Sequence, residues 1–497
     1  MSLVNLLSDY INAAFSGIWV QTVEPEEAER ELTDHARAQQ WKVITWDIAR
    51  GMKFPGDPNA TAPELNDPLA VLRALPSMGS TGDQNPQTTL LVLPNFHRFL
   101  NGIEIVQTLF DLLLTGKQRR LFVVVLSPVV QIPLELERSF IIIEHALPTP
   151  EQLSQIATEL LADQPDIRPT GTAWQGLLEA ASGLTRAEAE GAFALSLARH
   201  DRLHPEEIWD LKAQTLKKQN LLTLHRGQEH FARLGGLTAL KDFCVRALQP
   251  GRKVKPRGTL LLSPPGCGKS VFCRALGNET GRPVLTLDIG ALLGGLVGQT
   301  EQNVRQSLKI ADAMSPCILF CDELEKGLSG VGGTGDSGVS TRLFGTLLTW
   351  LADHQSDVFF VGTANDISRL PPEFTRAERL DAVFFIDLPG DAERQMIWDI
   401  YRREYDVAPN QPIPADTNWS GAEIKSCARL SALLDIPLSE AAQLIVPVAQ
   451  TAAEVVSRLR QWASGRCLSA DQTGLYQYTL ASTAGTRRKV KHDPSKN

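Results

Sequence analysis

The stretch "GTLLLSPPGCGKSVFCRAL", residues 258–276, decides the fold. Residues 260–262 read as a buried apolar strand, 263–270 as a loop, and the residues after the loop have helical spacing. The loop matches the phosphate-binding pattern G-x-x-x-x-G-K-[ST] except at its first position, where Ser263 replaces glycine. A Gly-rich turn between strand and helix is the plain alternative. The strand–loop–helix context favours a phosphate-binding loop.

The residue types in this loop suit a nucleotide. Glycines let backbone N–H groups curl around phosphate oxygens, and the following helix N-terminus adds partial positive charge. Lys269 would reach the β- and γ-phosphates, and the Ser270 hydroxyl would bind Mg²⁺. The predicted nucleotide-binding set in the loop is Pro265, Gly266, Cys267, Gly268, Lys269, Ser270 and Val271.

Acidic and amide side chains follow at the ends of later strands. The strand "CILFC" (317–321) ends in Asp322, predicted to hold Mg²⁺, and Glu323, predicted to orient and deprotonate the attacking water. The strand "VFFVGTANDI" (358–367) carries Asn365 toward the γ-phosphate. Strands at 283–290 and 383–389 continue the alternation with helices. This α/β pattern predicts a doubly wound parallel sheet with its ligand at the carboxyl ends of the strands.

From "LGGLTALK" (234–241) to about residue 466 the sequence resembles the classical AAA+ ATPases. The segment "GDSGVSTRLFGTLLTWL" (335–351) makes it similar to the plastid- and cyanobacterial-type conserved-reading-frame AAA proteins. The resemblance implies ATP hydrolysis with ATP and Mg²⁺ as cofactors, and Asn365 as sensor 1. It implies Arg376 and Arg379 as arginine fingers that reach a neighbouring subunit's nucleotide, although either could be a structural salt-bridge partner. Gly235, Gly421 and Ala422 complete the implied nucleotide-binding set.

A site completed by a neighbour's arginine requires an oligomer, and a hexameric ring is the usual form in this family. The expected job is remodelling of an unknown protein client or complex. The segment 294–306 resembles a first pore loop and the helix after it, but Leu296 and Val297 stand where threading relatives carry an aromatic residue. Two alternatives stay open. One is a nucleotide-gated scaffold or switch with slow turnover; the other is a protein that acts on nucleic acid through the basic run at 486–491.

The N-terminal half repeats the same order of strands. A shift of 241 residues places Gly17 on Gly258 and "VITWDI" (43–48) on "VLTLDI" (284–289). The strand at 122–136 parallels 359–374, and 140–153 parallels 383–396. At the positions of Lys269 and Ser270 stand Ala28 and Glu29, and at those of Asp322 and Glu323 stand Pro94 and Asn95. The sequence therefore predicts a second domain of the same fold without a working site. The alternative is that any two parallel-sheet domains share such strands.

The predicted domains are a degenerate αβ domain (1–200), a helical linker (201–233), the ATPase αβ domain (234–390), a helical lid (391–470) and a basic flexible tail (471–497). A net charge of −8 over 497 residues gives no reason to expect a nucleic-acid groove. No apolar run is long enough to span a bilayer, and the N-terminus lacks the basic region of a signal peptide. Seven cysteines form no C-x-x-C pair. We expect a soluble cytoplasmic protein.

Overall fold

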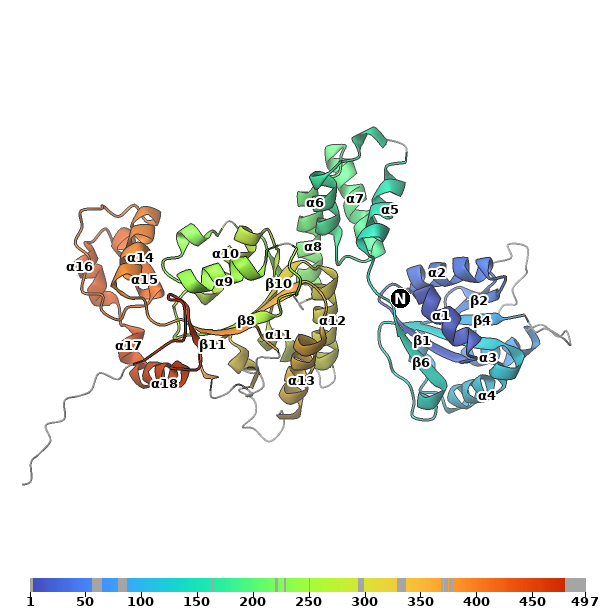
Figure 1. Cartoon of the computed structure of the whole chain (residues 1–497). Helices are drawn as coiled ribbons and strands as arrows, with labels where there is room; N and C mark the ends of the chain where they lie inside the picture. Colours follow the sequence, from blue (N-terminus) through green and yellow to red (C-terminus); the bar gives the residue numbers. More distant parts are fainter. Residues whose placement is uncertain are drawn as a thin grey trace, which may run out of the picture. The chain divides into compact units, whose positions relative to one another are not determined.

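The computed structural model describes residues 3–55, 65–78, 87–162, 165–219, 222–227, 229–249, 251–293, 299–328, 337–367, 370, 374 and 379–478. The chain divides into two units, Met1–Ile208 and Trp209–Asn497, and each is described by itself (Figure 1). Within the described part of the chain, no helix combines the length and apolar character needed to cross a membrane.

The first unit is built on a six-stranded sheet in the order β3-β2-β4-β5-β1-β6. All neighbours are parallel except β3, which runs antiparallel to β2. The strands are β1 (Gly17–Gln21), β2 (Lys42–Asp47), β3 (Gly51–Lys53), β4 (Thr89–Pro94), β5 (Leu121–Ser127) and β6 (Phe140–Glu144). The central strands are buried on both faces, which explains their continuous apolar sequence.

Helices cover both faces of this sheet. Helices α1 (Leu3–Asn12) and α2 (Pro25–Ala38) pack on one face, where they meet Ile18 and Val20 of β1. Helices α3 (Pro68–Met78) and α4 (Ile103–Arg119) pack on the other face, where they meet Trp19. Successive strand residues thus serve opposite cores. Four further helices follow: α5 (Pro150–Leu160), α6 (Thr172–Ala181), α7 (Arg186–His200) and α8 (Pro205–Gln219), the last of which crosses the boundary between the units.

The second unit contains a seven-stranded sheet in the order β13-β12-β8-β11-β10-β9-β7. Its strands are β7 (Leu222–His225), β8 (Gly258–Leu262), β9 (Val284–Leu287), β10 (Cys317–Cys321), β11 (Val358–Ala364), β12 (Ala382–Phe385) and β13 (Leu468–Ser469). Neighbouring strands are parallel except β7, which runs antiparallel to β9. Cys317 and Cys321 are both fully buried in β10.

Helices α9 (Thr238–Ala247) and α10 (Lys269–Thr280) cover one face of this sheet (Figure 1). Three further helices lie in the connections between strands. Helices α11 (Ile289–Leu293) and α12 (Gln299–Ala313) come between β9 and β10, and α13 (Ser337–Asp353) comes between β10 and β11. A helical group comes next, with its own apolar core around Trp398 and Trp419. It contains α14 (Asp391–Glu404), α15 (Gly421–Leu434), α16 (Leu438–Ala441), α17 (Val448–Thr451) and α18 (Ala453–Ala463).

The two sheets share one topology, which confirms the predicted fold of both halves. The order β2-β4-β5-β1-β6 corresponds strand for strand to β9-β10-β11-β8-β12. The register also corresponds: Gly17 lies opposite Val123 as Gly258 lies opposite Phe360. At both glycines a Cβ would come within 2.4 Å of a neighbouring backbone oxygen, so the close approach of the strands requires glycine. The antiparallel edge strand has a different place in the chain in the two sheets. In the first sheet β3 follows its neighbour β2, whereas in the second sheet β7 comes before all the other strands.

The structure corrects three details of the sequence interpretation. The alignment of 140–153 with 383–396 is two residues out of register, because Gly17 faces Phe140 while Thr259 faces Ala382. Residues 222–225, placed in a helical linker, form β7, because they pair antiparallel with β9 at the edge of the second sheet. Residues 471–478, placed in a flexible tail, close a hairpin on β13. The rest of that tail lies outside the described residues.

Candidate nucleotide site

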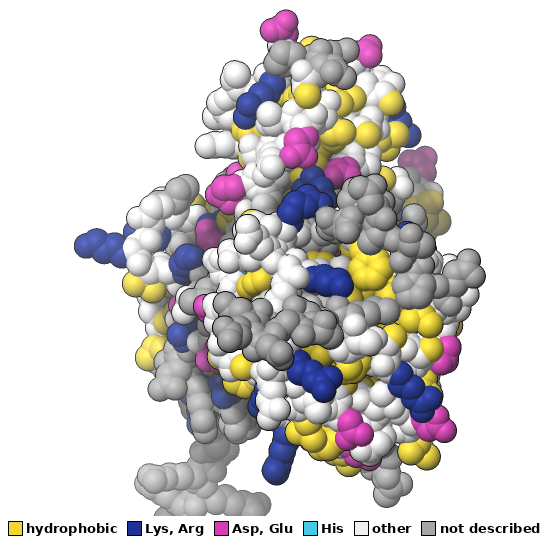
Figure 2. Space-filling view, turned by 90° about the vertical axis from the view of Figure 1, so that its right-hand side faces the viewer, with side chains coloured by type: hydrophobic (Ala, Val, Ile, Leu, Met, Phe, Trp, Pro, Cys, Tyr) yellow, Lys and Arg dark blue, Asp and Glu magenta, His cyan; other side chains and the backbone are white. Residues whose placement is uncertain are grey.

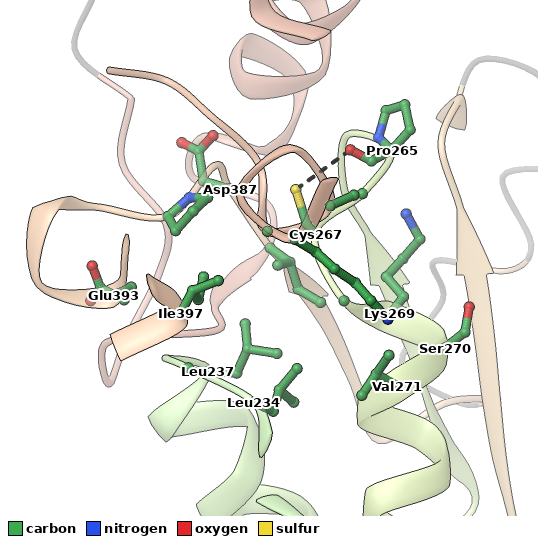
Figure 3. Close-up of a pocket in the computed structure, with 18 of the residues that line it drawn as sticks. Leu234, Leu237, Pro265, Cys267, Lys269, Ser270, Val271, Asp387, Glu393 and Ile397 are labelled. Atoms are coloured by element: carbon green, nitrogen blue, oxygen red, sulfur yellow. Dashed lines mark hydrogen bonds between the residues drawn. The ribbon is translucent and has the colours of Figure 1, made fainter. Parts of the chain in front are cut away.

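A cavity of about 320 Å³ opens at the carboxyl ends of β8, β10 and β11, between the αβ part of the second unit and the helices α14 and α15 (Figure 3). All the predicted loop residues from Pro265 to Val271 line it. So do the predicted residues Asp322, Glu323, Asn365, Gly235, Gly421 and Ala422. Segments that are far apart in the sequence therefore converge on one hollow, as expected for a parallel sheet.

The loop between β8 and α10 spans residues 263–268 and depends on two glycines. Gly266 has φ +80° and Gly268 has φ +84°, backbone conformations that other residues rarely adopt. A Cβ at Gly266 would lie 2.9 Å from the Ala422 Cβ. The absence of a side chain lets the loop approach α15 closely, and the Ala422 backbone N–H donates a hydrogen bond to the Gly266 carbonyl at 3.1 Å. Ser263 is not among the residues with positive φ, so this position does not need the glycine of the usual pattern.

Lys269 is the first residue of α10, and its ammonium group is buried. It donates to the Ser263 hydroxyl at 2.6 Å and to the Asn365 side-chain oxygen at 2.7 Å. The carbonyl of Pro264 is a further acceptor at 3.3 Å. Burial lowers the pKa of Lys269, and acidic neighbours oppose the shift. The charge is thus held by neutral oxygens that a phosphate group can replace.

Oxygen atoms that could bind a metal ion lie close together beside Lys269. The Ser270 hydroxyl donates to one oxygen of Asp322 at 3.0 Å, and the Thr363 hydroxyl donates to the other at 2.5 Å. Magnesium prefers a few such hard oxygen ligands and keeps water on its other positions. Ser270 and Asp322 therefore fit the predicted metal role. Thr363 was missed by the sequence analysis. It lies near the end of β11, two residues before Asn365, which directly follows Ala364, the last residue of the strand.

Glu323 directly follows Asp322 at the end of β10. Its backbone has φ +50°, and its N–H donates to the Thr363 hydroxyl at 2.8 Å. The Asn365 amide donates to one Glu323 carboxylate oxygen at 3.1 Å. Lys326 forms an ion pair with the other oxygen. The carboxylate is therefore held at the mouth of the cavity by groups on either side.

The opposite end of the cavity carries large apolar side chains, with a few carboxylates in its wall. Leu234, Leu237, Ile397 and Tyr401 line it, and Gly235 approaches the Ile397 side chain so closely that a Cβ would lie 2.8 Å from it. Figure 3 shows Leu237 and Ile397 on the side away from Lys269 and Ser270. A charged end beside an apolar end matches the shape of a nucleotide, which has phosphates at one end and a flat base at the other.

Of the two predicted arginine fingers, the structure describes only one. Arg376 lies outside the described residues, as do Leu296 and Val297 of the predicted pore loop. Arg379 is described and does not line the cavity of its own chain. Its Nη1 is buried and has no hydrogen-bond partner within the described part of the structure. Its predicted role toward a neighbouring subunit stays a prediction.

Comparison with known proteins shows the family of the chain. The uncharacterized AAA domain-containing protein ycf46 of Guillardia theta is 30% identical over 496 residues, covering 93% of this chain and 95% of that protein. The chain belongs to the AAA ATPase family. The ycf46 protein of Trieres chinensis is similar, at 29% identity over 91% of this chain and 95% of its own length.

Three family models match this AAA ATPase in succession. The N-terminal domain of SpoVK-like AAA ATPases matches residues 3–145 and their second domain matches 151–219. The model "ATPase family associated with various cellular activities (AAA)" matches residues 259–388. Other relatives match over a shorter stretch of the chain. The ribosome biogenesis ATPase RIX7 of Saccharomyces cerevisiae is 31% identical over 36% of this chain and 22% of its own.

The corresponding place in the first unit is closed. Here the loop between β1 and α2 is reduced to residues 22–24, so the turn that would hold phosphates is missing. The cavity left beside it measures about 20 Å³, roughly the space of one water molecule. Asn95 has φ +55°, like Glu323 at the same point of the second sheet, which supports the predicted alignment of the two strand ends. The shorter loop also overturns the predicted pairing of Ala28 with Lys269, because Pro25 begins α2 as Lys269 begins α10. Ala28 lies three residues further into its helix and is fully buried against the sheet.

Charged side chains of the chain fill that place. The Glu24 carboxylate accepts a hydrogen bond from the Arg186 backbone N–H at 2.5 Å, and burial raises its pKa. The Arg186 guanidinium bonds to Glu190 at 2.8 Å and Glu159 at 3.1 Å, and lies 3.7 Å from Glu27. We name these five residues the Arg186 cluster. It joins the β1–α2 loop to the start of α7, as the Gly266–Ala422 bond joins loop and helix in the second unit.

The helices α5–α7 also correspond to the lid of the second unit, which the sequence analysis missed. Thr185 caps α7 with Glu188 in a reciprocal capping box, and at the start of α15 the Ser420 N–H donates to the Glu423 carboxylate at 2.6 Å. Helix α5 packs on α7 as α14 packs on α15. The signal was present in the sequence as a threonine or serine followed three residues later by glutamate.

We predict that Lys269→Ala removes all measurable binding of Mg-ATP to the full-length chain. The phosphates lose their buried ammonium partner, and the closed first unit supplies no second site. Isothermal titration calorimetry with Mg-ATP, on the variant and on the unmodified chain, measures the result. Residual micromolar binding would contradict the closure of the first unit.

The Arg186 cluster predicts a local stability effect. Arg186→Ala leaves several carboxylates without their shared cation, and we expect a loss of about 1–3 kcal/mol in the opening free energy of α7. Hydrogen–deuterium exchange of residues 186–200 measures it. Arg37→Ala is the matched control, because its ion pair with Asp34 is exposed and should change stability by less than about 0.5 kcal/mol. Equal exchange in both variants would show that the cluster does not hold the helix.

Proposed function

We propose that this AAA ATPase binds Mg-ATP in the cavity of its second unit and hydrolyses it. The observation that carries the proposal is one connected network: Lys269 bonds to Asn365, and Asn365 bonds to Glu323. The Ser270–Asp322 pair lies beside it. A phosphate-binding cation, a cation-binding pair and a carboxylate base thus face a cavity with an apolar end of the kind that suits a nucleobase.

The residues divide the chemistry among them. Lys269 exchanges the oxygens of Ser263 and Asn365 for phosphate oxygens, and backbone N–H groups of the loop bind the same phosphates. A magnesium ion held by Ser270 and Asp322 would neutralise charge that develops on the phosphates. Glu323 accepts a proton from the attacking water, and the Asn365 amide orients that water or the γ-phosphate. This exchange frees Asn365 Oδ1 at the moment when the nucleotide arrives.

The proposed working form is a homo-oligomeric ring, with a hexamer as the family's usual size. Arg376 and Arg379 would complete a neighbour's site, and a head-to-tail interface is the arrangement that allows it. The proposed biological role is remodelling of a protein or protein complex in the cytoplasm. Support comes from the names of relatives that match a shorter stretch of the chain. They include RIX7 and the cell division cycle protein 48 homolog of Archaeoglobus fulgidus, which is 31% identical over 36% of this chain and 26% of its own.

One observation favours a second candidate, a nucleotide-gated switch with slow turnover. Glu323 is paired with Lys326 as well as Asn365, so its carboxylate must leave a cation before it can take a proton. Action on nucleic acid has weaker support. On the face drawn in Figure 2, the Lys and Arg side chains of the described residues stand apart from one another. The basic run at 486–491 lies outside the described residues.

We expect Glu323→Gln to bind Mg-ATP as the unmodified protein does and to hydrolyse it at least about 100-fold more slowly, because general-base catalysis contributes factors of this size. Phosphate release and calorimetry measure the two properties separately. Glu440→Gln, an exposed change in the helical group, is the control and should leave both unaltered. Turnover near the normal rate in Glu323→Gln would remove Glu323 from the mechanism.

A mixing experiment tests the shared site. Arg376→Ala should lower kcat by about 10³-fold or more while ATP still binds, since arginine fingers contribute effects of that order. A Lys269→Ala subunit cannot bind nucleotide but retains Arg376. Mixing the two variants should restore part of the activity, because the Lys269→Ala subunit lends its arginine to the neighbour's intact loop. Absence of recovery in mixed oligomers, verified by differently tagged subunits, would assign Arg376 a structural role.

A further inference from the structure

A hairpin at the C-terminal end of the described chain reaches the apolar end of the nucleotide cavity. Residues 467–476 form it: Leu468 bridges Leu475, and the Tyr476 N–H donates to the Cys467 carbonyl at 2.8 Å. Its first strand, β13, pairs with β12 and so extends the central sheet. The sequence analysis divided this hairpin between the lid and a flexible tail.

Three attachments fix the hairpin beside the cavity. The Ala470 N–H donates to the Phe385 carbonyl at 3.1 Å, and the Leu240 N–H donates to the Ala470 carbonyl at 3.0 Å. The Tyr476 hydroxyl donates to Asp387 at 2.6 Å. Asp387 also accepts a hydrogen bond from Arg460 at 2.7 Å, and it lines the cavity (Figure 3). Ala470 itself is fully buried, so the residue after it has little freedom to move.

That next residue, Asp471, is carried into the cavity wall. Its Oδ1 accepts a hydrogen bond from the Leu237 N–H at 2.6 Å. A Cβ on Gly236 would lie 3.0 Å from the same oxygen, so the carboxylate abuts the Gly235–Gly236 turn at the apolar end. Within the described part of the chain, no donor is bonded to the other oxygen, Oδ2. Burial is the main cause of a raised pKa for Asp471, which is the mark of a carboxylate that has lost much of its water.

We propose that Asp471 is a specificity-determining residue that accepts a hydrogen bond from the 6-amino group of an adenine nucleotide. The proposal rests on the proposed function, since it concerns the base of the same nucleotide. Adenine presents an N–H donor at position 6, whereas hypoxanthine and guanine present an oxygen acceptor there. An acceptor facing the Asp471 carboxylate is repelled and leaves a desolvated polar group unpaired, so the site selects the 6-amino base.

The alternative role for Asp471 is to hold the backbone of the Gly235–Leu237 loop. The substitution Asp471→Asn separates the two roles. Its side-chain oxygen still accepts from the Leu237 N–H, but its amide replaces Oδ2 with a donor. The loop therefore keeps its anchor while the hydrogen-bonding preference toward the base is reversed.

The experiment measures equilibrium binding of Mg-ADP and Mg-IDP to the full-length chain by calorimetry. The two bases differ at the 6-position, amino in adenine and oxo in hypoxanthine, and at the adjacent N1, which carries a hydrogen in hypoxanthine alone. We expect the unmodified protein to prefer ADP by about 10-fold or more, and the ADP/IDP affinity ratio to fall by about 10-fold or more in Asp471→Asn, as expected when one hydrogen-bonding pair is exchanged. Asp471→Ala should bring the ratio close to one. Asp435→Asn, an exposed change at the end of α15, should leave it unaltered.

Each remaining outcome overturns the inference. An unchanged ratio in Asp471→Asn, or an equal loss of both nucleotides, assigns Asp471 to loop positioning alone. Equal binding of ADP and IDP by the unmodified protein shows that the 6-position is not read. Absence of binding of either nucleotide by the unmodified protein would overturn the proposed function itself, so the two failures are distinguishable.

Discussion

The buried ammonium group of Lys269 is the constraint on which the rest of the site depends. Removing such a charge from water costs several kcal/mol unless it is compensated. The structure compensates it with oxygens from the loop itself and from Asn365 at the end of β11. This choice of partners ties three features together: the six-residue loop, the order of the strands, and the amide that also touches Glu323. Because the partners are neutral, a phosphate offers the ammonium a stronger interaction than it has without ligand.

The first unit shows what the same sheet becomes when that constraint is absent. With residues 22–24 as its whole β1–α2 loop, no backbone turn is available for phosphates. The position above the sheet is taken instead by Arg186 and its surrounding carboxylates. The strand registers and the close approach at Gly17 are retained, since these serve the core. Packing and ligand binding therefore depend on separable sets of residues in one fold.

Much of this was predictable from the sequence for physical reasons. The strand–loop–helix around Lys269 and the acidic end of β10 are local patterns, and local patterns determine local geometry. The repeat of strand types predicted the shared fold, because a buried parallel sheet needs apolar strands in a given order. The β12 alignment was two residues off, since one apolar strand can be slid along another without a change in its pattern.

Other features depend on contacts that span the chain and leave little local trace. Thr363 and Asp471 are polar residues in otherwise ordinary segments, and their importance comes from what the fold brings opposite them. The C-terminal hairpin looked like the start of a tail because its sequence is short and rich in small polar residues. Its order comes from β12 and α9, to which it is hydrogen-bonded.

The two units close their helical groups on the sheet by different means, and this difference has a consequence. In the first unit the β1–α2 loop and α7 are joined by charges that belong to the protein, so their association does not depend on a ligand. In the second unit the loop and α15 share one direct backbone bond at Gly266, beside a cavity that a nucleotide would fill. A ligand that touches both the loop and the helical group stabilises their closed arrangement by its differential affinity. Under the proposed function, a bound nucleotide would therefore act on the second unit, whereas the ion pairs of the Arg186 cluster hold the first unit without a ligand.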